Sequence, residues 1–454
     1  MLRRTKIVAT LGPATDDPKV LDEVIAAGVD VVRLNMSHGT HGDHERRADW
    51  VRNRARASGR QVGVLIDLQG PKIRCGKFVG GKVELAPDER FILDTSWDID
   101  AGNRERVGVT YPTLHDEVGR GDTLLLNDGH IVLWVEQVEA TEVRCKVVVG
   151  GTLSNNKGIN RLGGGLSAPA LTEKDKKDIR FAARLQADYV AVSFVRSADD
   201  VHTTRQLLRE AGGQGGIVSK IERAEALDAI EEIIDASDVI MVARGDLGVE
   251  IGDAELPAVQ KRLISEARSL NCVVITATQM MESMIQNPIP TRAEVFDVAN
   301  AVIDGTDAVM LSGESAAGKY PAKAVEAMDR VCKEAEKQSQ TRQSDHRLHS
   351  VFGRIDEAIA MATMYTANHL GVAAIAALTE SGSTCKWMSR ISSGIPIYAL
   401  TGQVATRRKV TLYRGVYPVS FDLEPGIDSR QANTEVIEEL QRRGAVRDLS
   451  LIHI

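Results

Sequence analysis

Short apolar runs alternate with helical patterns along most of the chain. The first run covers residues 7–11 and ends at Gly12-Pro13, and apolar positions spaced as on one helix face follow it. The same strand-helix unit recurs until eight strands are expected, at residues 7–11, 31–37, 62–67, 189–194, 217–222, 239–243, 273–278 and 308–312. Because near-continuous apolar strands are typical of a parallel sheet covered on both faces, the pattern predicts an α/β fold built on a (β/α)8 TIM barrel.

The alternation is interrupted after the third strand. Residues 70–167 instead carry alternating, valine-rich segments with Gly and Asp turns, and Asp128-Gly129 is a hairpin signal. We therefore expect a barrel formed by residues 1–69 and 168–336, with residues 70–167 inserted as an all-β, β-barrel lid domain.

A third region follows a polar segment at residues 337–349. Helical patterns are expected at residues 358–369, 384–391, 405–412 and 431–443, and strands at residues 372–378, 395–401 and 416–421. Alternation on this scale predicts a small three-layer α/β domain over residues 350–454.

Charged side chains follow two neighbouring strands of the predicted barrel. Lys220 and Glu222 are two residues apart, so they share a face of an extended chain, and Arg244-Gly245-Asp246 closes the next strand. Active sites of such barrels lie at the carboxyl ends of the strands. Two carboxylates suit Mg²⁺, and a lysine beside them can stabilise charge on a phosphoryl group or an enolate. The structural alternative is a buried ion pair in the barrel core.

Three further groups of polar residues follow strand ends: Arg33, Asn35 and Ser37; Asp67, Lys72 and Arg74; and Thr276, Thr278 and Glu282. The first group alternates and is expected to face one way, either to bind an anion or to cap the barrel. The second lies where the insertion begins, and its cations suggest a polyanionic ligand. The two threonines of the third share a face by the same period of two, which fits either a site or ordinary strand packing.

Composition limits the possible partners and compartment. The chain has 454 residues, 43% of them hydrophobic, and a formal net charge of −7, which argues against a nucleic-acid partner. The five cysteines are scattered and never spaced as metal ligands, so we expect reduced thiols in a cytoplasmic protein. The basic start of the chain has no signal-peptide cleavage site after it, and no apolar run is long enough for a membrane helix, so no membrane partner is expected.

Several long motifs occur in one order along the chain: Arg33-Leu-Asn-Met-Ser-His-Gly39, Asp67-Leu-Gln-Gly-Pro-Lys-Ile-Arg74, Ser219-Lys-Ile-Glu222, Met241-Val-Ala-Arg-Gly-Asp-Leu-Gly-Val-Glu250, Ala277-Thr-Gln-Met-Met-Glu-Ser-Met284 and Pro290-Thr-Arg-Ala-Glu294. Together they resemble the pyruvate kinase family, of the bacterial sort, over nearly the whole chain. The resemblance implies a barrel with a β lid and a C-terminal regulatory domain, usually in a homotetramer.

The resemblance also implies an activity, the last step of glycolysis, in which the phosphoryl group of phosphoenolpyruvate is transferred to ADP to give ATP and pyruvate. Glu222 and Asp246 would hold the metal, Mg²⁺ or Mn²⁺, and Lys220 would stabilise the phosphoryl group and the enolate. Substrate would also be bound by Arg33 at its phosphate and by Gly245, Asp246 and Thr278 at its carboxylate end, with Thr278 near the path of protonation. The nucleotide would be bordered by Pro13, Asn35, His38, Arg74, Lys157 and Glu282. Alone, His38 is more typical of a surface histidine and Lys157 of a solvated charge.

One departure from the family concerns monovalent cations. Relatives that need K⁺ carry Glu at the position of Lys72 and Thr at that of Leu68. The ammonium of Lys72 can supply positive charge where K⁺ would otherwise lie, near Asn35, Ser37 and Asp67. We therefore expect no K⁺ requirement.

The C-terminal region carries a candidate effector site. Residues 379–384 join a strand to a helix start, where backbone N–H groups and hydroxyls can bind an anion, or simply form a capping turn. In relatives this segment binds the phosphate of a sugar-phosphate or nucleotide effector, which implies roles for Thr379, Ser381, Gly382, Ser383 and Thr384. The last residues, 448–454, differ from the family's ending, so we expect a truncated terminus with a loosened C-terminal domain and a weak effector response.

Two other function classes remain open from the residues alone. A carbon–carbon lyase on the same fold would also use a metal and an enolate, but it leaves Arg33, Arg74 and Lys157 without a polyphosphate to bind. A metabolite-binding regulator without activity is the non-enzymatic alternative, although every motif residue of the family is present.

Overall fold

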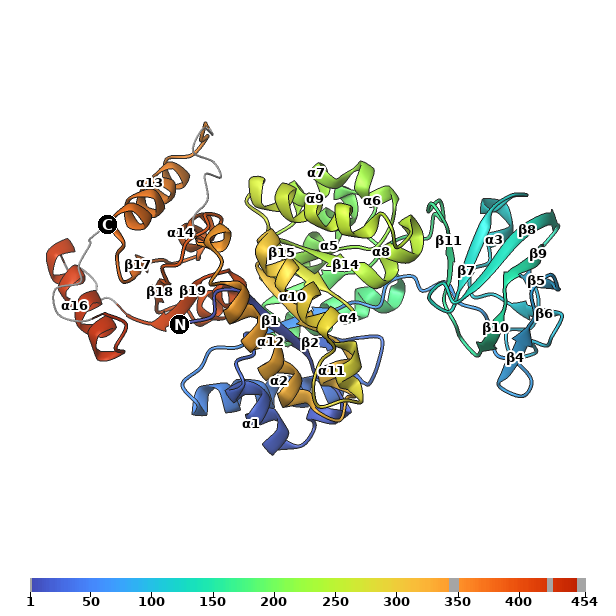
Figure 1. The fold of residues 1–454 in the computed structure, drawn as a ribbon, viewed down its shortest axis with the longest axis horizontal. Helices are drawn as coiled ribbons and strands as arrows, with labels where there is room; N and C mark the ends of the chain where they lie inside the picture. The colour runs from blue at the N-terminus through green and yellow to red at the C-terminus, as the bar shows by residue number, and fades with distance from the viewer. Residues whose placement is uncertain (1, 343–350, 423–427, 447–454) are drawn as a thin grey trace.

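The computed structural model describes residues 2–342, 351–422 and 428–446 (Figure 1). Three parts follow one another along its long axis, with the C-terminal α/β domain at one end, the barrel in the middle and the β lid at the other end. The lid and the C-terminal domain therefore lie on opposite sides of the barrel. The expected tail at residues 448–454 falls outside the described residues.

The eight predicted strands form a closed parallel barrel in the order β1-β16-β15-β14-β13-β12-β3-β2. Their bounds are β1 Lys6–Thr10, β2 Val31–Asn35, β3 Gly63–Asp67, β12 Tyr189–Val192, β13 Gly216–Ile221, β14 Val239–Ala243, β15 Val273–Ala277 and β16 Ala308–Leu311. Six of these strands are buried at every residue, and β2 and β13 each have one partly exposed residue, as expected for a sheet with side chains packed inside and helices outside. The predicted fold class is therefore confirmed.

Amphipathic helices cover the outside of the barrel: α1 Pro18–Ala26, α2 His41–Ala57, α4 Glu173–Arg184, α5 Ala198–Glu210, α6 Glu225–Asp228, α7 Ile230–Ala236, α8 Arg244–Ile251, α9 Leu256–Ser269, α10 Arg292–Asp304, α11 Gly313–Ala316 and α12 Pro321–Ala335. Local sequence sets their ends. The Thr291 hydroxyl accepts from the Glu294 N–H in a capping box that starts α10, and Gly305 ends this helix with φ of 98°.

The lid is a curled six-stranded sheet with a small two-stranded sheet beside it. The larger sheet has the order β11-β7-β8-β9-β5-β6, and β10 pairs with β4. Its strands are β4 Lys82–Leu85, β5 Arg90–Asp94, β6 Arg106–Gly108, β7 Thr123–Leu126, β8 Ile131–Glu139, β9 Glu142–Val149, β10 Gly151–Ser154 and β11 Ile159–Arg161. The predicted hairpin turn at Asp128-Gly129 joins β7 to β8, with positive φ at both residues. A short helix, α3 Leu114–Glu117, interrupts the otherwise β insertion.

The C-terminal domain packs against the amino ends of the barrel strands. Its parallel sheet has the order β17-β18-β19, and Lys6 at the start of β1 donates to the Val416 carbonyl at 2.6 Å. The domain comprises α13 Ile355–Leu370, β17 Ile375–Leu378, α14 Ser383–Ser389, β18 Ile397–Thr401, α15 Val404–Lys409, β19 Val416–Ser420 and α16 Ser429–Arg442. This docking leaves the carboxyl ends of the barrel strands facing the lid (Figure 1).

None of the helices in the described ranges is both long and apolar enough to cross a membrane.

Candidate active site

A lysine lies between two carboxylates at the carboxyl ends of β3 and β13. The Lys220 Nζ is 2.8 Å from Glu222 Oε1 and 3.5 Å from Asp67 Oδ1, and it donates to the Ser193 hydroxyl at 2.7 Å. The side chains of Glu222 and Asp67 are each 1% exposed, and that of Lys220 is 12% exposed. Burial by itself disfavours the Lys220 ammonium, but the two carboxylates outweigh it and raise the lysine pKa above its ordinary value.

Arg33 shares Asp67 with this lysine. The Arg33 Nε donates to Asp67 Oδ2 at 2.6 Å, and Nη1 donates to the Thr10 hydroxyl at 3.0 Å. Burial opposes ionisation of Asp67, yet the neighbouring cations Lys220 and Arg33 hold its pKa below the usual range. Asp67 is therefore a charged anchor that fixes two cations at the mouth of the barrel.

Glu222 and Asp246 fit a divalent metal. Burial and the Glu222 carboxylate raise the pKa of Asp246 to about 7, which means that a second negative charge is unfavourable here without a nearby cation. Within the described part of the chain, no three His, Cys, Asp or Glu side chains gather as a metal site. Asp246 lines an open cavity and Glu222 is buried beside Lys220. Two such carboxylates suit an ion such as Mg²⁺, which takes few protein ligands and keeps water or substrate oxygens.

Thr278 lies beside Gly245 at the ends of β15 and β14. The Gly245 N–H donates to the Thr278 hydroxyl at 2.8 Å. The prediction that Thr276 and Thr278 share a face is wrong, because β15 ends at Ala277 and Thr278 has φ of 67°. The Thr276 hydroxyl instead donates to Thr306 at 3.0 Å. A Cβ added at Gly245 would lie 3.5 Å from its nearest neighbour, so no protein neighbour requires glycine there.

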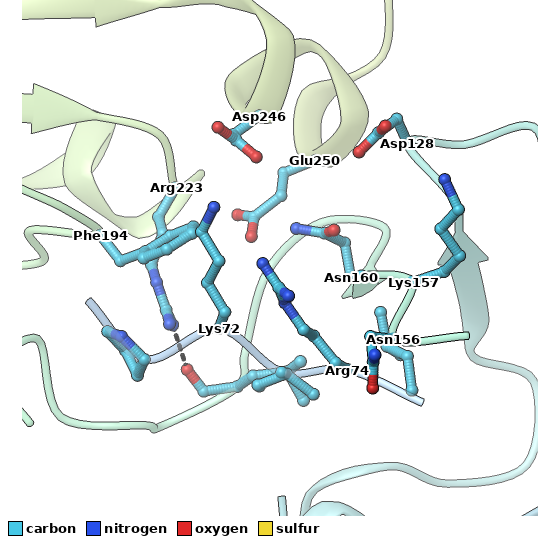
Figure 2. A pocket seen from close by; sticks show the side chains of 15 residues that line it. Lys72, Arg74, Asp128, Asn156, Lys157, Asn160, Phe194, Arg223, Asp246 and Glu250 are labelled. Carbon is cyan, nitrogen blue, oxygen red and sulfur yellow. Dashed lines mark hydrogen bonds between the residues drawn. The ribbon is translucent and has the colours of Figure 1, made fainter. Parts of the chain in front are cut away.

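A cavity of about 250 Å³ lies between the lid and the barrel, next to Asp246 (Figure 2). Four predicted site residues line it: Lys72, Arg74, Lys157 and Asp246. Six further polar or aromatic residues that line it were not predicted as site residues: Asp128, Asn156, Asn160, Phe194, Arg223 and Glu250. The cavity therefore joins residues from the barrel strand ends to residues from the lid.

The cationic side of the site includes His38. Partial burial lowers the pKa of the His38 imidazole, and Lys72, Arg74 and Arg33 lower it further by charge repulsion. Lys72 is exposed as a whole residue, but protein around its ammonium removes part of the hydration and lowers the lysine pKa. The positive charge of Lys220 lowers this pKa further. A surface on which cations repel one another in this way favours a polyanionic ligand.

Several predicted nucleotide residues lie outside this cavity. Pro13 starts the 3-10 turn η1 Pro13–Thr15, the Asn35 side chain accepts from the Ser37 N–H at 3.0 Å, and Glu282 is exposed at the start of η2 Glu282–Ile285. With His38, these residues belong to the barrel and are absent from the described lining of the cavity. The prediction that Arg33, Asn35 and Ser37 face one way does not extend to Ser37, since β2 ends at Asn35.

The predicted monovalent-cation region includes Leu68 and Lys72, which lie in different surroundings. Leu68 is buried, and its carbonyl accepts from the Ser193 hydroxyl at 2.8 Å. The charges that act on Lys72 are those of Lys220, Asp246, Arg74 and Glu222. The place of Lys72 in a monovalent-cation region remains a prediction.

The predicted effector segment is a tight turn before α14. The Gly382 N–H donates to the Thr379 hydroxyl at 2.9 Å, and the hydroxyls of Ser381 and Ser383 are 3.0 Å apart. These polar groups bond one another within the turn. An effector role for this segment, including Thr384, remains a prediction.

The residues that sequence reasoning missed gave weak signals. Arg223 directly follows one of the quoted motifs, Glu250 is the last residue of another, and Phe194 ends a predicted strand. The spacing of these residues along the sequence does not mark any of them as a site residue. Asn156 and Asn160 lie in the lid, where the sequence does not indicate which face meets the barrel.

The fold and the site define a class: a (β/α)8 barrel with an inserted lid, in which Lys220, Glu222 and Asp67 cluster at the strand ends and Asp246 lines a cavity together with cations of the lid. The chain matches the family models "Pyruvate kinase, barrel domain" over residues 2–325 and "Pyruvate kinase, alpha/beta domain" over residues 357–453. This chain belongs to the pyruvate kinase family.

Individual relatives agree with this assignment. The chain is 57% identical over 447 residues to pyruvate kinase II of Salmonella typhimurium, covering 98% of this chain and 93% of that protein. It is 56% identical over 422 residues to a pyruvate kinase of Haemophilus influenzae, covering 92% of this chain and 88% of that protein. A crystal structure of a pyruvate kinase from Cryptosporidium parvum matches with a TM-score of 0.91 at 34% identity, covering 98% of this chain and 92% of that one.

Proposed function

We propose that this protein transfers the phosphoryl group of phosphoenolpyruvate to ADP and so produces ATP and pyruvate. One observation carries the proposal: the ammonium of Lys220, held between Glu222 and Asp67, lies at the same strand ends as Asp246, which opens onto a cavity lined by cations. A fixed ammonium at this position can stabilise the transferred phosphoryl group and the enolate that remains when it leaves.

The remaining barrel residues bind and orient the substrate in this proposal. Arg33, fixed by Asp67, contacts the substrate phosphate, and Gly245 and Thr278 contact its carboxylate end. The Thr278 hydroxyl lies near the path by which the enolate carbon gains its proton. Glu222 and Asp246 hold the divalent ion, Mg²⁺ or Mn²⁺, which when bound supplies positive charge to the phosphate oxygens.

The lid and the rim of the barrel bind the nucleotide. Arg74 and Lys157 line the cavity from the lid. In this proposal Pro13, Asn35, His38 and Glu282 contact the nucleotide from the barrel, outside the lining of that cavity. The ammonium of Lys72 removes the need for K⁺, since it supplies fixed positive charge close to the metal carboxylates.

The proposal extends to organisation and regulation. Residues 1–69 and 168–336 form the catalytic barrel, residues 70–167 the lid, and residues 350–454 a regulatory domain in which the turn at residues 379–384 binds a sugar phosphate or nucleotide. Four copies assemble, which would cover exposed apolar side chains such as Phe296, 70% exposed, and Ile355, 81% exposed. Five buried, unpaired cysteines support a cytoplasmic location.

The test is pyruvate formation from phosphoenolpyruvate and ADP, measured with and without Mg²⁺. The proposal predicts pyruvate and ATP in equal amounts, and no product when Mg²⁺ is chelated. Absence of ATP formation in the presence of Mg²⁺, or cleavage of a carbon–carbon bond in a 2-oxo acid instead, would overturn it.

A further inference from the structure

Two segments connect the lid to the barrel, and both meet at Phe194. Phe194 follows β12 with φ of 57°, a left-handed conformation that is unusual for an aromatic residue and indicates a constrained position. The outgoing segment passes over this ring at Gly70, where an added Cβ would lie 2.9 Å from Phe194 Cδ2 and 2.8 Å from Ser193 Cβ. Gly70 also has φ of 67°, so only glycine fits this crossing without strain.

The return segment is fastened to the same ring through Arg223. The Arg223 guanidinium lies 5.4 Å from the centroid of the Phe194 ring, and its Nη1 donates to the carbonyl of Leu166, a lid residue that also lines the cavity. Figure 2 shows Arg223 beside Phe194, with this hydrogen bond as a dashed line. Arg223 is 4% exposed, so its contact with the lid is shielded from water.

A backbone carbonyl and a carboxylate of the barrel hold the residues just before Leu166. The Gly163 N–H donates to the Glu250 carbonyl at 2.9 Å, and the Gly165 N–H donates to the Glu225 carboxylate. The Glu250 carboxylate accepts from the Ala224 N–H at 2.9 Å, which ties the helix α8 to the residue after Arg223. The return segment therefore has several fixed contacts, with Arg223 as the one that reaches the aromatic ring.

Phe194 also connects this junction to the metal carboxylate. Its backbone N–H donates to Glu222 Oε2 at 2.8 Å, while Lys220 holds the other oxygen of Glu222. Phe194 thus contacts the outgoing segment and Glu222 directly, and it is linked to the return segment through Arg223.

We propose that Arg223 and Phe194 form a pivot that sets the position of the lid over the barrel, and that they are positioning residues for the lid cations Arg74 and Lys157. When the guanidinium is removed, the return segment loses its link to the ring, and the lid moves away from the cavity. The barrel residues proposed to bind phosphoenolpyruvate remain in place, because among the described residues Arg33, Lys220 and Thr278 are held by Thr10, Asp67, Ser193, Glu222 and Gly245 of the barrel.

The first test measures the lid directly and requires no activity. Nitroxide labels are placed on Val79→Cys in the lid and Glu173→Cys in the barrel, two positions whose side chains are exposed, while the five native cysteines are buried. Pulsed EPR on the ligand-free protein should give a longer mean distance and a broader distribution in Arg223→Met and in Phe194→Leu. The matched control is Arg184→Met, which removes a guanidinium 5.3 Å from the Phe181 ring on helix α4, and it should leave the distribution unchanged.

The second test rests on the proposed function. In Arg223→Met the half-saturating ADP concentration should rise about tenfold, the scale of losing one charge-assisted hydrogen bond, while that of phosphoenolpyruvate stays unchanged. If the parent protein makes no pyruvate, the proposed function fails and the EPR measurement still decides the pivot. If Arg223→Met does not fold, the same measurements are made on Arg223→Lys. This variant keeps a positive charge over the Phe194 ring but loses the guanidinium group that donates to Leu166. An EPR distribution that superimposes on the parent's in both Arg223 and Phe194 variants overturns the pivot, as does an equal rise for both substrates.

Discussion

Replacement of Lys220 by methionine separates the proposed catalytic role from a purely structural one. Methionine fills a similar volume but has no charge, so the change removes the ammonium that lies 2.8 Å from Glu222 and 3.5 Å from Asp67. We expect Mg²⁺ and phosphoenolpyruvate still to bind, because the carboxylates and Arg33 remain. Turnover should fall by roughly 10²-fold or more, the effect of removing one preorganised charge stabiliser.

The same substitution also affects stability. A unit charge pair 4 Å apart near a protein surface is worth about 4 kcal/mol, and removing one partner of a buried pair typically costs about 3–5 kcal/mol of unfolding free energy. Asp67 keeps Arg33 as its partner, so Glu222 is the carboxylate that loses its cation. Lys220→Met should therefore unfold at a lower denaturant concentration than the parent. This loss is measured separately, so that turnover is compared only among folded molecules.

Lys6→Met is the matched control. Lys6 is also buried, with 2% of the residue exposed, but it lies at the amino end of β1 and bonds the C-terminal domain. Lys6→Met should lower the free energy of unfolding, while turnover per folded molecule stays near that of the parent. Steady-state kinetics at saturating phosphoenolpyruvate, ADP and Mg²⁺ decide the matter, and near-normal turnover of Lys220→Met would refute the proposed role of the lysine.

Three further predictions follow from named contacts. Glu222→Gln and Asp246→Asn should each raise the half-saturating Mg²⁺ concentration by about tenfold or more, and unchanged Mg²⁺ dependence in both would contradict their assignment as ligands. The parent should be active in K⁺-free buffer, and Lys72→Glu should acquire a K⁺ requirement. About tenfold activation of the parent by K⁺ over Na⁺ at constant ionic strength, which corresponds to about 1.4 kcal/mol, would exclude the idea that Lys72 takes the place of K⁺. Arg390→Met should cost about 3–5 kcal/mol of unfolding free energy in urea titrations, because it leaves Asp307, 2% exposed, without its bidentate partner at the junction of the barrel and the C-terminal domain. A loss below about 1 kcal/mol, as for an exposed pair, would contradict that estimate.

The barrel could be predicted from the sequence because its signals are local. A strand buried on both faces must be apolar almost throughout, and each covering helix needs one apolar stripe, so burial leaves a pattern that short windows reveal. The same reasoning placed Lys220, Glu222 and Asp246 at neighbouring strand ends, where they lie in the structure, since the carboxyl ends of parallel strands meet at one end of a barrel. The lid, with its alternating segments and Asp128-Gly129 turn, was equally visible as an insertion.

Backbone conformation at the strand ends was less predictable. The expectation for Thr278 assumed an extended chain, but its left-handed conformation turns the hydroxyl toward Gly245. A strand's period of two holds only while its backbone stays extended, and pairing with neighbouring strands decides where that ends.

Contacts between segments far apart in sequence were decided by the tertiary structure alone. Arg223 meets Leu166 of the lid and the ring of Phe194, and Arg390 meets Asp307 across two domains. Hydrophobic periodicity reports whether a side chain is buried, but it carries no information about which distant polar group lies opposite. The sequence by itself thus determined the barrel, the insertion and the chemistry at the strand ends, whereas the way the lid attaches, and the residues that it brings to the cavity, depended on how the three domains pack.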